Sequence, residues 1–465
     1  MLNMEMQQTI KNNISFSGVG IHTGVSTKMM LKPAKEDYGI RFIRIDLENK
    51  PEIKVDVDNV FDTQRSTSLK KENAEIHTVE HILAAITGAE IDNLIIEVDN
   101  IEIPILDGSA KDFSYEIEKA GITMQKAKRK YFTINRTISL TDEETGAKLI
   151  ATPSANYEID IEIDYNSKTL GKQNASIKNI SHFQREIASS RTFCFLHELE
   201  DLLEKNLVKG GDINNAIVVV ENEISNKKLL ELKKAFNNPE IKVNDGGYLN
   251  NLTLRHKNEP ARHKLLDVIG DLSLVGAPIK GKITAFKPGH KNNTKFAKKL
   301  KSIMIDQIRK TAPEINFNEK PIYDKQKIKS ILPHRDPFLF IDEIRDIGDD
   351  FIIGVKFVKA EEEYFKGHFP KEPVMPGVLQ LETMAQAGGV LILNTVENPQ
   401  DYLTFFMKID NAKFKQKVVP GDTIIFRLNL ISPIRRGICH MHGVGFVNNK
   451  IVVEAELLAQ IAPKK

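Results

Sequence analysis

The sequence predicts an α+β protein with three parts. Two similar N-terminal halves each form a two-layer α/β sandwich, and a C-terminal helix is wrapped by an antiparallel sheet. Three observations support this fold class. The chain has 465 residues, which is too many for one compact core. Strand-like and helical stretches follow in the same order twice in the larger, N-terminal part. A polar segment then precedes a last part with one apolar helix and long strand-like runs.

The two N-terminal halves are expected at residues 1–127 and 128–310. In the first, the strand-like runs GIRFIRI and EIKVDVDNV lead to a helix around HTVEH, then to strand NLIIEVD and a helix near Ala110 to Ala120. In the second, YFTINRTISL and NYEIDIEIDY lead to a helix around His263 to Leu274, strand KGKITAFK and a helix from Thr294 to Gln307. This shared order favours an internal duplication.

The C-terminal part is expected at residues 322–465, after a linker at residues 311–321. The linker lies in the polar segment QIRKTAPEINFNEKPIYDKQKIKS. One apolar helix, Val378 to Leu393, comes before the strand-like runs TIIFRLNLI, CHMHGVGFV and IVVEAELLA. A helix wrapped by a long antiparallel sheet is the simplest fold for this order.

The composition is ordinary for a globular protein and excludes several functional classes. Lys and Arg number 65 and Asp and Glu 63, so the net charge of +2 (65 − 63) offers no basic field for nucleic acid. No apolar run approaches the length of a membrane span, and no apolar leader opens the chain. The two cysteines, Cys194 and Cys439, fit a reducing compartment. We therefore expect a cytoplasmic protein with no transmembrane segment.

The stretch HTVEH places two histidines, His77 and His81, around Glu80. On a helix, residues four apart share a face, so both imidazoles could hold one metal ion. An H-x-x-E-H protease uses such a pair. A solvated or core-satisfied histidine pair is the alternative, because short motifs match by chance.

The later stretch ARHKLLDVIGDLSL favours a metal site with a different ligand set. It places His263, Asp267 and Asp271 at successive turns of one helical face. An imidazole and a carboxylate one turn apart can grip a divalent ion, and His81 can supply a third ligand. Glu80 beside it would then be the base for an activated water. Asp271, one turn further on, would support the metal site as a carboxylate that does not bind the ion itself.

With two ligands supplied by HKLLD, His77 is surplus and is not expected to bind the metal.

Two further stretches supply the remaining catalytic groups. In AFKPGHKNN, His290 follows a strand in a Gly/Pro turn with no apolar face to bury it. Its expected role is general acid to a leaving amine, or a cation that stabilises an oxyanion, held by Asp271. In SSRTFCF, the Thr192 hydroxyl could serve the oxyanion, and an ordinary strand residue is the alternative.

Residues 1 to about 310 resemble the bacterial zinc amidase family UDP-3-O-acyl-N-acetylglucosamine deacetylase, which acts in lipid A synthesis. The motifs are FSGVGIHTG, TVEHILAAITG, IDNLIIEVDNIEIPILDGSA, SSRTFCF, RHKNEPARHKLLDVIGDL and KPGHKNN. The resemblance implies two α+β halves with the site between them, a UDP-sugar lipid substrate and a Zn²⁺ ion. The implied metal ligands are His81, His263 and Asp267, the implied catalytic residues are Glu80, Thr192, Lys264, Asp271 and His290, and Phe193 lines the substrate site with Lys264.

The segment Leu196 to Ile217 resembles the insert of that family that forms an apolar passage for the acyl chain. Its Leu199, Leu202 and Leu203 fit such a passage. An ordinary amphipathic helix explains the same spacing equally well, so both interpretations stay open.

A second constellation lies in FKGHFPKEPVMPGVLQLETMAQAGG. His368 sits in a Gly/Phe/Pro loop, and Glu382 lies on the helix that begins near Gly377, amid the apolar stripe of Val378, Leu381, Met384 and Ala385. Read singly, Glu382 is a solvated carboxylate and His368 a turn residue. Together they suit β-elimination, in which one group removes the proton α to a thioester and the other protonates the departing hydroxyl. Amides at the helix start would stabilise the enolate-like charge.

Residues 322 to 465 resemble the (3R)-hydroxyacyl-acyl-carrier-protein dehydratases of the hot-dog fold, through ILPHRDPFLFID, GHFPKEPVMPGVLQLETMAQ and KFKQKVVPGD. The resemblance implies catalysis by His368 and Glu382 without metal or organic cofactor, with Gln386 orienting Glu382 and the Gly377 amide holding the thioester oxygen. It also implies a homo-oligomer, because family members combine His and Glu from different chains. The run EEEYFK lacks a family asparagine, which concerns a loop. Glutamate at position 382 favours a dehydratase over the related dehydratase-isomerase, which carries aspartate there.

The expected function is therefore a bifunctional enzyme: a zinc-dependent hydrolase of lipid A synthesis fused to a lyase of fatty-acid synthesis. The acidic acyl carrier protein is the expected partner of the second activity. The basic clusters Lys413, Lys415, Lys417 and Arg435–Arg436 would steer it, and a solvated charged edge is the alternative explanation. Two rival functions remain at this point. One half could bind lipid without catalysis, or the C-terminal part could be a thioesterase, which would release the carrier and form no enoyl product.

Overall fold

The computed structural model describes residues 5–199, 215–222, 224–235, 238–243, 247–249 and 253–464. The chain divides into two compact units, residues 1–302 and 303–465. The expected linker at residues 311–321 contains no helix or strand, and its role as a domain boundary stays a prediction. Among the described residues, no helix combines the length and apolarity needed to cross a bilayer.

The first unit contains a five-stranded and a six-stranded sheet, which share the topology of five strands. Each of these five-strand series contains four pairs of neighbouring strands. The third pair is parallel, and the other three are antiparallel. The first sheet has the order β2 (Ile14–Val19), β3 (Ser26–Pro33), β9 (Leu94–Val98), β4 (Ile40–Arg44) and β5 (Glu52–Lys54). The second has the order β12 (Ile138–Asp142), β13 (Ala147–Thr152), β18 (Ile279–Phe286), β14 (Tyr157–Ile163) and β15 (Gln173–Ile177), and the short strand β11 (Phe132–Thr133) also pairs with β18.

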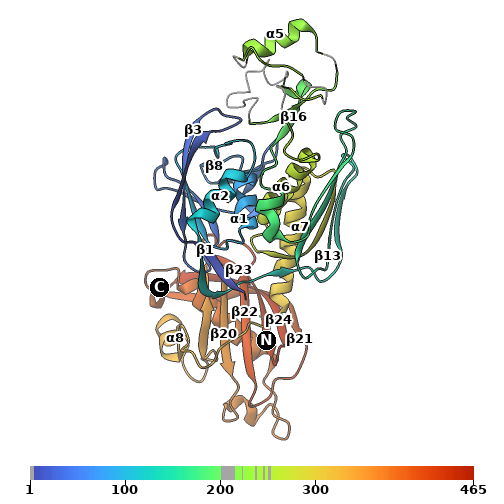
Figure 1. Cartoon of the computed structure of the whole chain (residues 1–465). Helices are drawn as coiled ribbons and strands as arrows, with labels where there is room; N and C mark the ends of the chain where they lie inside the picture. Colours follow the sequence, from blue (N-terminus) through green and yellow to red (C-terminus); the bar gives the residue numbers. More distant parts are fainter. Residues whose placement is uncertain are drawn as a thin grey trace. The chain divides into compact units, whose positions relative to one another are not determined.

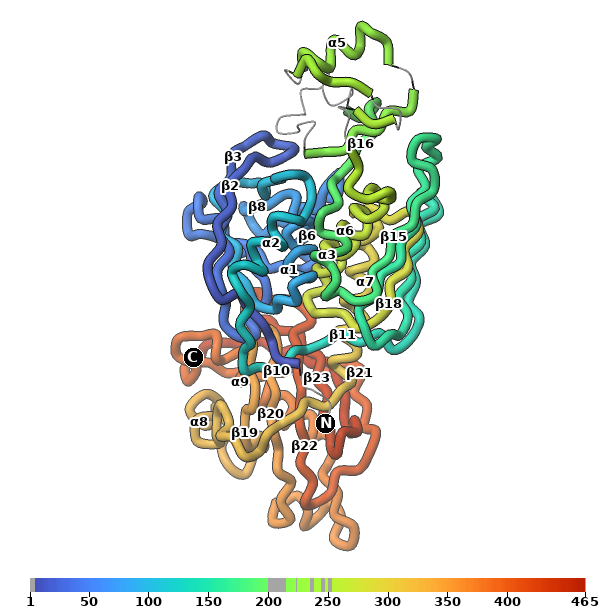
Figure 2. Tube along the Cα trace, viewed as in Figure 1, coloured from blue at the N-terminus to red at the C-terminus, as the bar shows by residue number. Residues whose placement is uncertain are grey.

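Each of these sheets is layered with two helices at equivalent places in the chain. The helices are α1 (Glu80–Gly88) and α2 (Lys111–Ala120) in the first half and α6 (Glu259–Ser273) and α7 (His290–Lys310) in the second. Figures 1 and 2 show the helices between the two sheets, and α1 packs against α6. The expected duplication of an α+β unit is thus visible in the strand order, and equivalent helices meet at the centre of the unit.

Smaller elements complete the first unit. They are the strand pair β1 (Met6–Ile10) and β10 (Ile122–Lys128), the hairpin-like group β6 (Val60–Asp62), β7 (Ser68–Lys71) and β8 (Ala74–Ile76), the pair β16 (Phe193–Phe195) and β17 (Ile217–Val219), and the helices α3 (Phe183–Glu186) and α5 (Asn226–Ala235). Strand β16 begins directly after Thr192, and the preceding Arg191 donates to Glu259, the first residue of α6, so Thr192 and Phe193 lie near the N-terminus of that helix.

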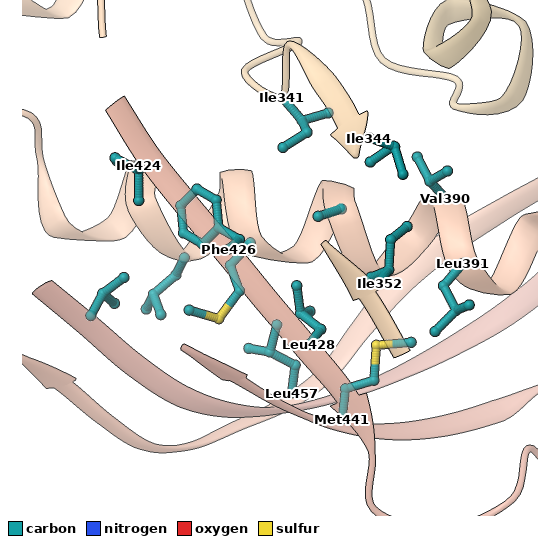
Figure 3. Packing of buried hydrophobic residues seen from close by; sticks show 14 of the residues in the cluster. Ile341, Ile344, Ile352, Val390, Leu391, Ile424, Phe426, Leu428, Met441 and Leu457 are labelled. Carbon is teal, nitrogen blue, oxygen red and sulfur yellow. The ribbon is translucent and has the colours of Figure 1, made fainter. Parts of the chain in front are cut away.

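The second unit is a six-stranded antiparallel sheet around the helix α9 (Gly377–Leu393), as expected. The sheet order is β19 (Glu343–Ile347), β20 (Phe351–Phe357), β22 (Thr423–Leu430), β23 (Ile438–Val447), β24 (Lys450–Pro463) and β21 (Tyr402–Phe414), and the short helix α8 (Lys325–Ile331) precedes it. Figure 3 shows Val390 and Leu391 of the helix in the same buried hydrophobic cluster as Phe426, Leu428 and Met441 of the strands. Gly388 follows Ala387 on the helix and lets the strands approach closely, because a Cβ atom there would lie 2.8 Å from Met441 and 3.1 Å from Leu428.

Candidate active sites

Helices α1 and α6 bring the three expected metal ligands together. The ligand atoms of His81, His263 and Asp267 all lie within 4.8 Å of one another. The Nε2 atom of His263 lies 3.4 Å from Oδ1 of Asp267, and Nε2 of His81 lies 3.9 Å from the same oxygen. All three side chains are buried, with exposed fractions of 4% or less. Two imidazoles and one carboxylate therefore converge on one point, the donor set of a catalytic zinc site.

The hydrogen bonds around this cluster leave the right atoms free for a cation. Nδ1 of His263 lies 3.1 Å from the carbonyl oxygen of Ser190, so its N–H donates there and Nε2 stays available. Oδ2 of Asp267 accepts from the ammonium of Lys264 at 2.8 Å. Its Oδ1 is buried and has no hydrogen-bond donor among the described residues. A buried carboxylate oxygen without a donor, facing two imidazole nitrogens, fits a divalent ion such as zinc.

The protonation states in this cluster are those that metal ligands need. Burial and the neighbouring His263 lower the pKa of His81 to about 3, and burial also lowers the pKa of His263. Burial opposes ionisation of Asp267, but Lys264 and the nearby imidazoles outweigh it and lower the pKa of Asp267. The imidazoles are thus neutral and the carboxylate is charged at neutral pH, so both can donate electron pairs to a metal.

An acid and a base flank the cluster. Nδ1 of His290 donates to Oδ2 of Asp271 at 2.9 Å. Burial lowers the pKa of His290, but Asp271 and Asp267 outweigh it and raise this pKa to about 9. Burial raises the pKa of Glu80 to about 7, although the cationic His290 opposes the shift. A protonated imidazole and a carboxyl group poised near neutrality are suited to proton transfer in both directions.

Two expectations about these histidines are corrected by the structure. The helix begins at Glu80 and excludes His77, because Thr78 takes a left-handed conformation (φ 60°) and donates its hydroxyl to the buried carboxylate of Glu102. His77 instead pairs with the Ser68 hydroxyl at 2.7 Å, so the two histidines of HTVEH share no helical face. His290 is the first residue of α7 and is buried, so it does not lie in an exposed turn. Its ion pair with Asp271 compensates this burial.

The residues expected to contact substrate lie beside the metal ligands. The ring of Phe193 lies 6.4 Å from the His263 ring between centroids, and the Lys264 ammonium lies 5.6 Å from the Phe193 centroid. Thr192 is half-buried, and its backbone N–H donates to the carbonyl oxygen of Gly108 at 2.7 Å. Of the expected acyl passage, Leu199 is buried in an apolar cluster, whereas Leu202 and Leu203 lie outside the described residues.

The second constellation centres on Glu382, which is half-buried on α9. Gln386 donates to Oε1 of Glu382 at 2.9 Å, and Nε2 of His334 lies 3.4 Å from the same oxygen. Gln386 is itself held by the N–H of Phe340 and the carbonyl oxygen of Phe338, both at 2.8 Å. Burial raises the pKa of Glu382, but the hydrogen bonds from His334 and Gln386 outweigh it and lower this pKa. The carboxylate is therefore ionised and fixed in orientation.

His368 and Glu382 are not joined within one chain. Nδ1 of His368 lies 2.8 Å from the carbonyl oxygen of Val374, which fixes the ring in the segment before α9. No hydrogen bond or ion pair links the two side chains in the described part of a single copy. Gly377 is the first residue of α9, where a Cβ atom would lie 2.7 Å from the Phe414 ring. Val378, expected in the apolar stripe, is 69% exposed, whereas Leu381 and Met384 of that stripe are buried.

Three residues of these sites, Asn293, His334 and Thr67, are not predicted by the sequence. Asn293 donates to Asp271 at 2.8 Å, and it could have been found one helical turn after His290 if that histidine had been placed on a helix. His334 lies in the quoted stretch ILPHRDPFLFID, but no spacing connects it to Glu382. The hydroxyl of Thr67 contacts Asp271 from the stretch QRSTSL, which carries no recognisable pattern.

Comparisons with known proteins cover both units. A family model described as "LpxC: UDP-3-O-acyl N-acetylglycosamine deacetylase" matches residues 7–238 and 233–302. A second, "FabA: FabA-like domain", matches residues 332–456. A protein named "Bifunctional enzyme LpxC/FabZ" from Bacteroides thetaiotaomicron is 46% identical over 99% of this chain and 100% of its own length. Proteins of the same name from Porphyromonas gingivalis (46% identical, 99% of this chain and 100% of the relative) and Chlorobaculum tepidum (39% identical, 99% of each) match in the same way.

Proposed function

Because this chain belongs to the family of bifunctional LpxC/FabZ enzymes, we propose that it carries two activities on one polypeptide. The N-terminal unit hydrolyses the N-acetyl group of UDP-3-O-((3R)-hydroxyacyl)-N-acetylglucosamine in lipid A synthesis. The C-terminal unit dehydrates (3R)-hydroxyacyl thioesters of acyl carrier protein to trans-2-enoyl thioesters in fatty-acid synthesis. The observation that carries the proposal is the convergence of His81, His263 and Asp267 beside Glu80 and His290 in a chain that matches its bifunctional relatives from end to end.

The deacetylation site is proposed to hold zinc through His81, His263 and Asp267. Bound there, the ion supplies Lewis acidity that activates water and polarises the acetamide carbonyl. Glu80 accepts the proton of the attacking water, because it directly precedes the ligand His81 at the start of α1 and its pKa is raised to about 7. His290 is cationic and donates a proton to the departing amine, so the C–N bond breaks as the amine leaves neutral.

Thr192, Phe193 and Lys264 are proposed to handle the substrate in that site. The Thr192 hydroxyl donates to the oxyanion of the tetrahedral intermediate, a role for which its place directly before β16 suits it. Lys264 presents a half-buried ammonium that Asp267 stabilises, and Asp267 raises the pKa of Lys264 against the effect of desolvation. The buried Leu199 of the apolar cluster supports a passage for the acyl chain, and an amphipathic packing segment remains the alternative.

The dehydration site is proposed to form between two copies of the chain. Within one copy, His368 and Glu382 are not joined, whereas β21 is an edge strand of the sheet with a row of exposed apolar side chains, namely Phe405, Phe406, Met407, Ile409 and Phe414. Edge strands pair readily with a second copy. In the assembled site one of the pair removes the α-proton, the other protonates the β-hydroxyl, and water leaves as the double bond forms. No metal or organic cofactor is needed for this step.

The expected protein partner of this site is acyl carrier protein, in the cytoplasm. The cluster Lys413, Lys415 and Lys417 is exposed, which supports docking of an acidic protein. Two of these lysines are already paired, Lys415 with Glu454 at 2.7 Å and Lys417 with Glu372 at 2.6 Å. This pairing also fits the alternative of a solvated charged edge. The main support for docking of acyl carrier protein is therefore that the substrates of this unit are thioesters of that protein.

The proposed function is tested by mass spectrometry of both products from the full chain. Glu80→Gln should abolish loss of the acetyl group while dehydration continues, and Glu382→Gln should do the reverse. Carrier release without an enoyl product would instead identify the C-terminal unit as a thioesterase. If Glu80→Gln retained full deacetylation, a binding role for the N-terminal unit would replace the catalytic one.

A further inference from the structure

Thr67 makes contact with the base, the acid and the carboxylate that holds the acid. Its backbone N–H donates to Oε2 of Glu80 at 3.0 Å. Its hydroxyl donates to Oδ1 of Asp271 at 2.5 Å and lies 3.3 Å from Nδ1 of His290. The residue is fully buried, with an exposed fraction of 0%. One side chain and its own amide therefore connect all three groups of the proton-transfer machinery.

Thr67 lies in the first of the duplicated halves and connects it to the second. Thr67 directly precedes β7, and its carbonyl oxygen accepts from the N–H of Val79 at 3.2 Å, so it is fixed to the residue before α1. Asp271 and His290 come from α6 and α7 of the other half. The base Glu80 and the acid His290 thus belong to different halves, and Thr67 contacts both of them.

The Asp271 carboxylate depends on Thr67 for one of its two oxygens. Oδ2 accepts from His290 at 2.9 Å and from Asn293 at 2.8 Å, whereas Oδ1 accepts from the Thr67 hydroxyl. Asp271 is completely buried, so an oxygen that loses its donor cannot recruit bulk water at no cost. Without the hydroxyl, Oδ1 has no donor, and only the contacts of Oδ2 with His290 and Asn293 hold the orientation of the carboxylate.

We propose that Thr67 is a positioning residue for the deacetylation reaction, which sets the geometry of Glu80 and of the Asp271–His290 pair. The proposal rests on the proposed deacetylase function and adds a residue to it. Thr67 touches neither the substrate nor the metal ligands in this account. It acts through its hydroxyl on Asp271 and through its amide on Glu80, and a side-chain substitution separates the two because it spares the amide.

The test compares Thr67→Val with Thr67→Ser in the full-length chain loaded with zinc. Valine keeps the shape and the amide but removes the hydroxyl, and serine keeps the hydroxyl. Loss of a hydrogen bond to a buried charged group predicts that kcat for deacetylation falls roughly ten- to hundredfold in Thr67→Val. KM and zinc content should stay at the wild-type values, and Thr67→Ser should remain close to wild type.

Three controls keep the outcome interpretable. Thr27→Val removes a buried hydroxyl that has no partner among the described residues, and it should leave kcat unchanged. In an Asp271→Asn background, Thr67→Val should have little further effect on kcat. If Thr67→Val does not fold, Thr67→Ala compared with Thr67→Ser gives the same contrast, and urea unfolding of each variant reports whether the N-terminal unit is folded.

Wild-type kcat in Thr67→Val would overturn the proposal, and so would an equal loss in Thr67→Ser. A change confined to KM would also contradict a positioning role. Absence of deacetylation in the wild-type chain is a different result, because it would remove the proposed function itself.

Discussion

Gly270 lies against the backbone carbonyl of Glu80, so closely that a Cβ atom at this position would be 2.1 Å from the carbonyl oxygen. Gly270 lies on α6 between Asp267 and Asp271, and Glu80 is the first residue of α1. The missing side chain lets the two helices approach where the metal ligands face each other. These helices occupy equivalent places in the duplicated halves, so the close contact sets the distance across which the site forms.

Gly270→Ala should separate α1 from α6 and damage the metal site. Overpacking of this kind costs roughly 1–3 kcal/mol of folding free energy. We expect weaker zinc binding and a lower deacetylation rate, with dehydration by the same chain unaffected. Metal content after dialysis and the two reaction rates measure this.

Gly289→Ala is the matched control, because a Cβ atom there would meet no other atom within 4 Å. It should bind zinc as the wild type does. Unchanged zinc binding in Gly270→Ala would show that the helices tolerate separation and would contradict the argument.

The two histidines of HTVEH should differ in their effect on metal content. His81→Ala removes a ligand, and we expect a loss of zinc affinity greater than the roughly 10–100-fold typical of outer-shell partners. His77→Ala removes contacts with Ser68, Glu75 and Phe61, none of which is an expected metal ligand, so zinc should bind in its normal stoichiometry. Metal analysis of both variants decides between them, and zinc loss in His77→Ala would restore the protease-like reading of the motif.

The buried pair of Arg191 and Glu259 should contribute stability that disappears in acid. Burial raises the pKa of Glu259, but hydrogen bonds from Arg191 and from the amides of Arg191 and Arg255 outweigh it and lower this pKa below 4.5. A carboxyl group with a lowered folded-state pKa stabilises the fold above its unfolded-state pKa, and the contribution fades as the pH falls through the folded-state value.

Glu259→Gln should therefore destabilise the N-terminal unit at neutral pH, by up to about 3–5 kcal/mol. The difference from wild type should shrink below pH 4.5, the ordinary value for glutamate. Urea unfolding at several pH values measures it. Glu116→Gln, which removes a surface pair with Lys119, should have little effect at any pH. A deficit for Glu259→Gln that does not change with pH would contradict the electrostatic explanation.

Mixing two inactive variants should restore dehydration if the site is shared between copies. Under random pairing, half of the dimers of His368→Ala with Glu382→Gln are mixed, and each mixed dimer has one intact site of two. The predicted activity is thus about one quarter of wild type. The two variants measured separately serve as controls. No recovery after unfolding and joint refolding would place both residues in one chain's site.

Much of the fold follows from local pattern in the sequence, and the structure shows why. The alternation in NYEIDIEIDY and the helical spacing of ARHKLLDVIGDL are set by burial of one face, so the duplicated sheets and helices were predictable. The start of α1 was not, because a short-range pattern cannot reveal that Thr78 takes a left-handed conformation to reach Glu102. That contact spans 24 residues and depends on the finished fold.

The sites divide in the same way. Ligands such as His263 and Asp267 lie one turn apart and are visible as a pair, and the resemblance to known motifs connected them to His81. The contacts that orient these groups come from distant segments. Thr67 reaches Asp271 across 204 residues and His334 reaches Glu382 from a turn before the sheet, so only the three-dimensional arrangement reveals them.

The central claim is that one chain carries a metal-dependent deacetylase and a metal-independent dehydratase. The most direct test treats the full-length protein with a chelator and follows both products by mass spectrometry in the same sample, then adds zinc back. We predict that deacetylation collapses and returns with zinc, while dehydration continues at its original rate throughout. Loss of both activities, or survival of deacetylation without metal, would contradict the account.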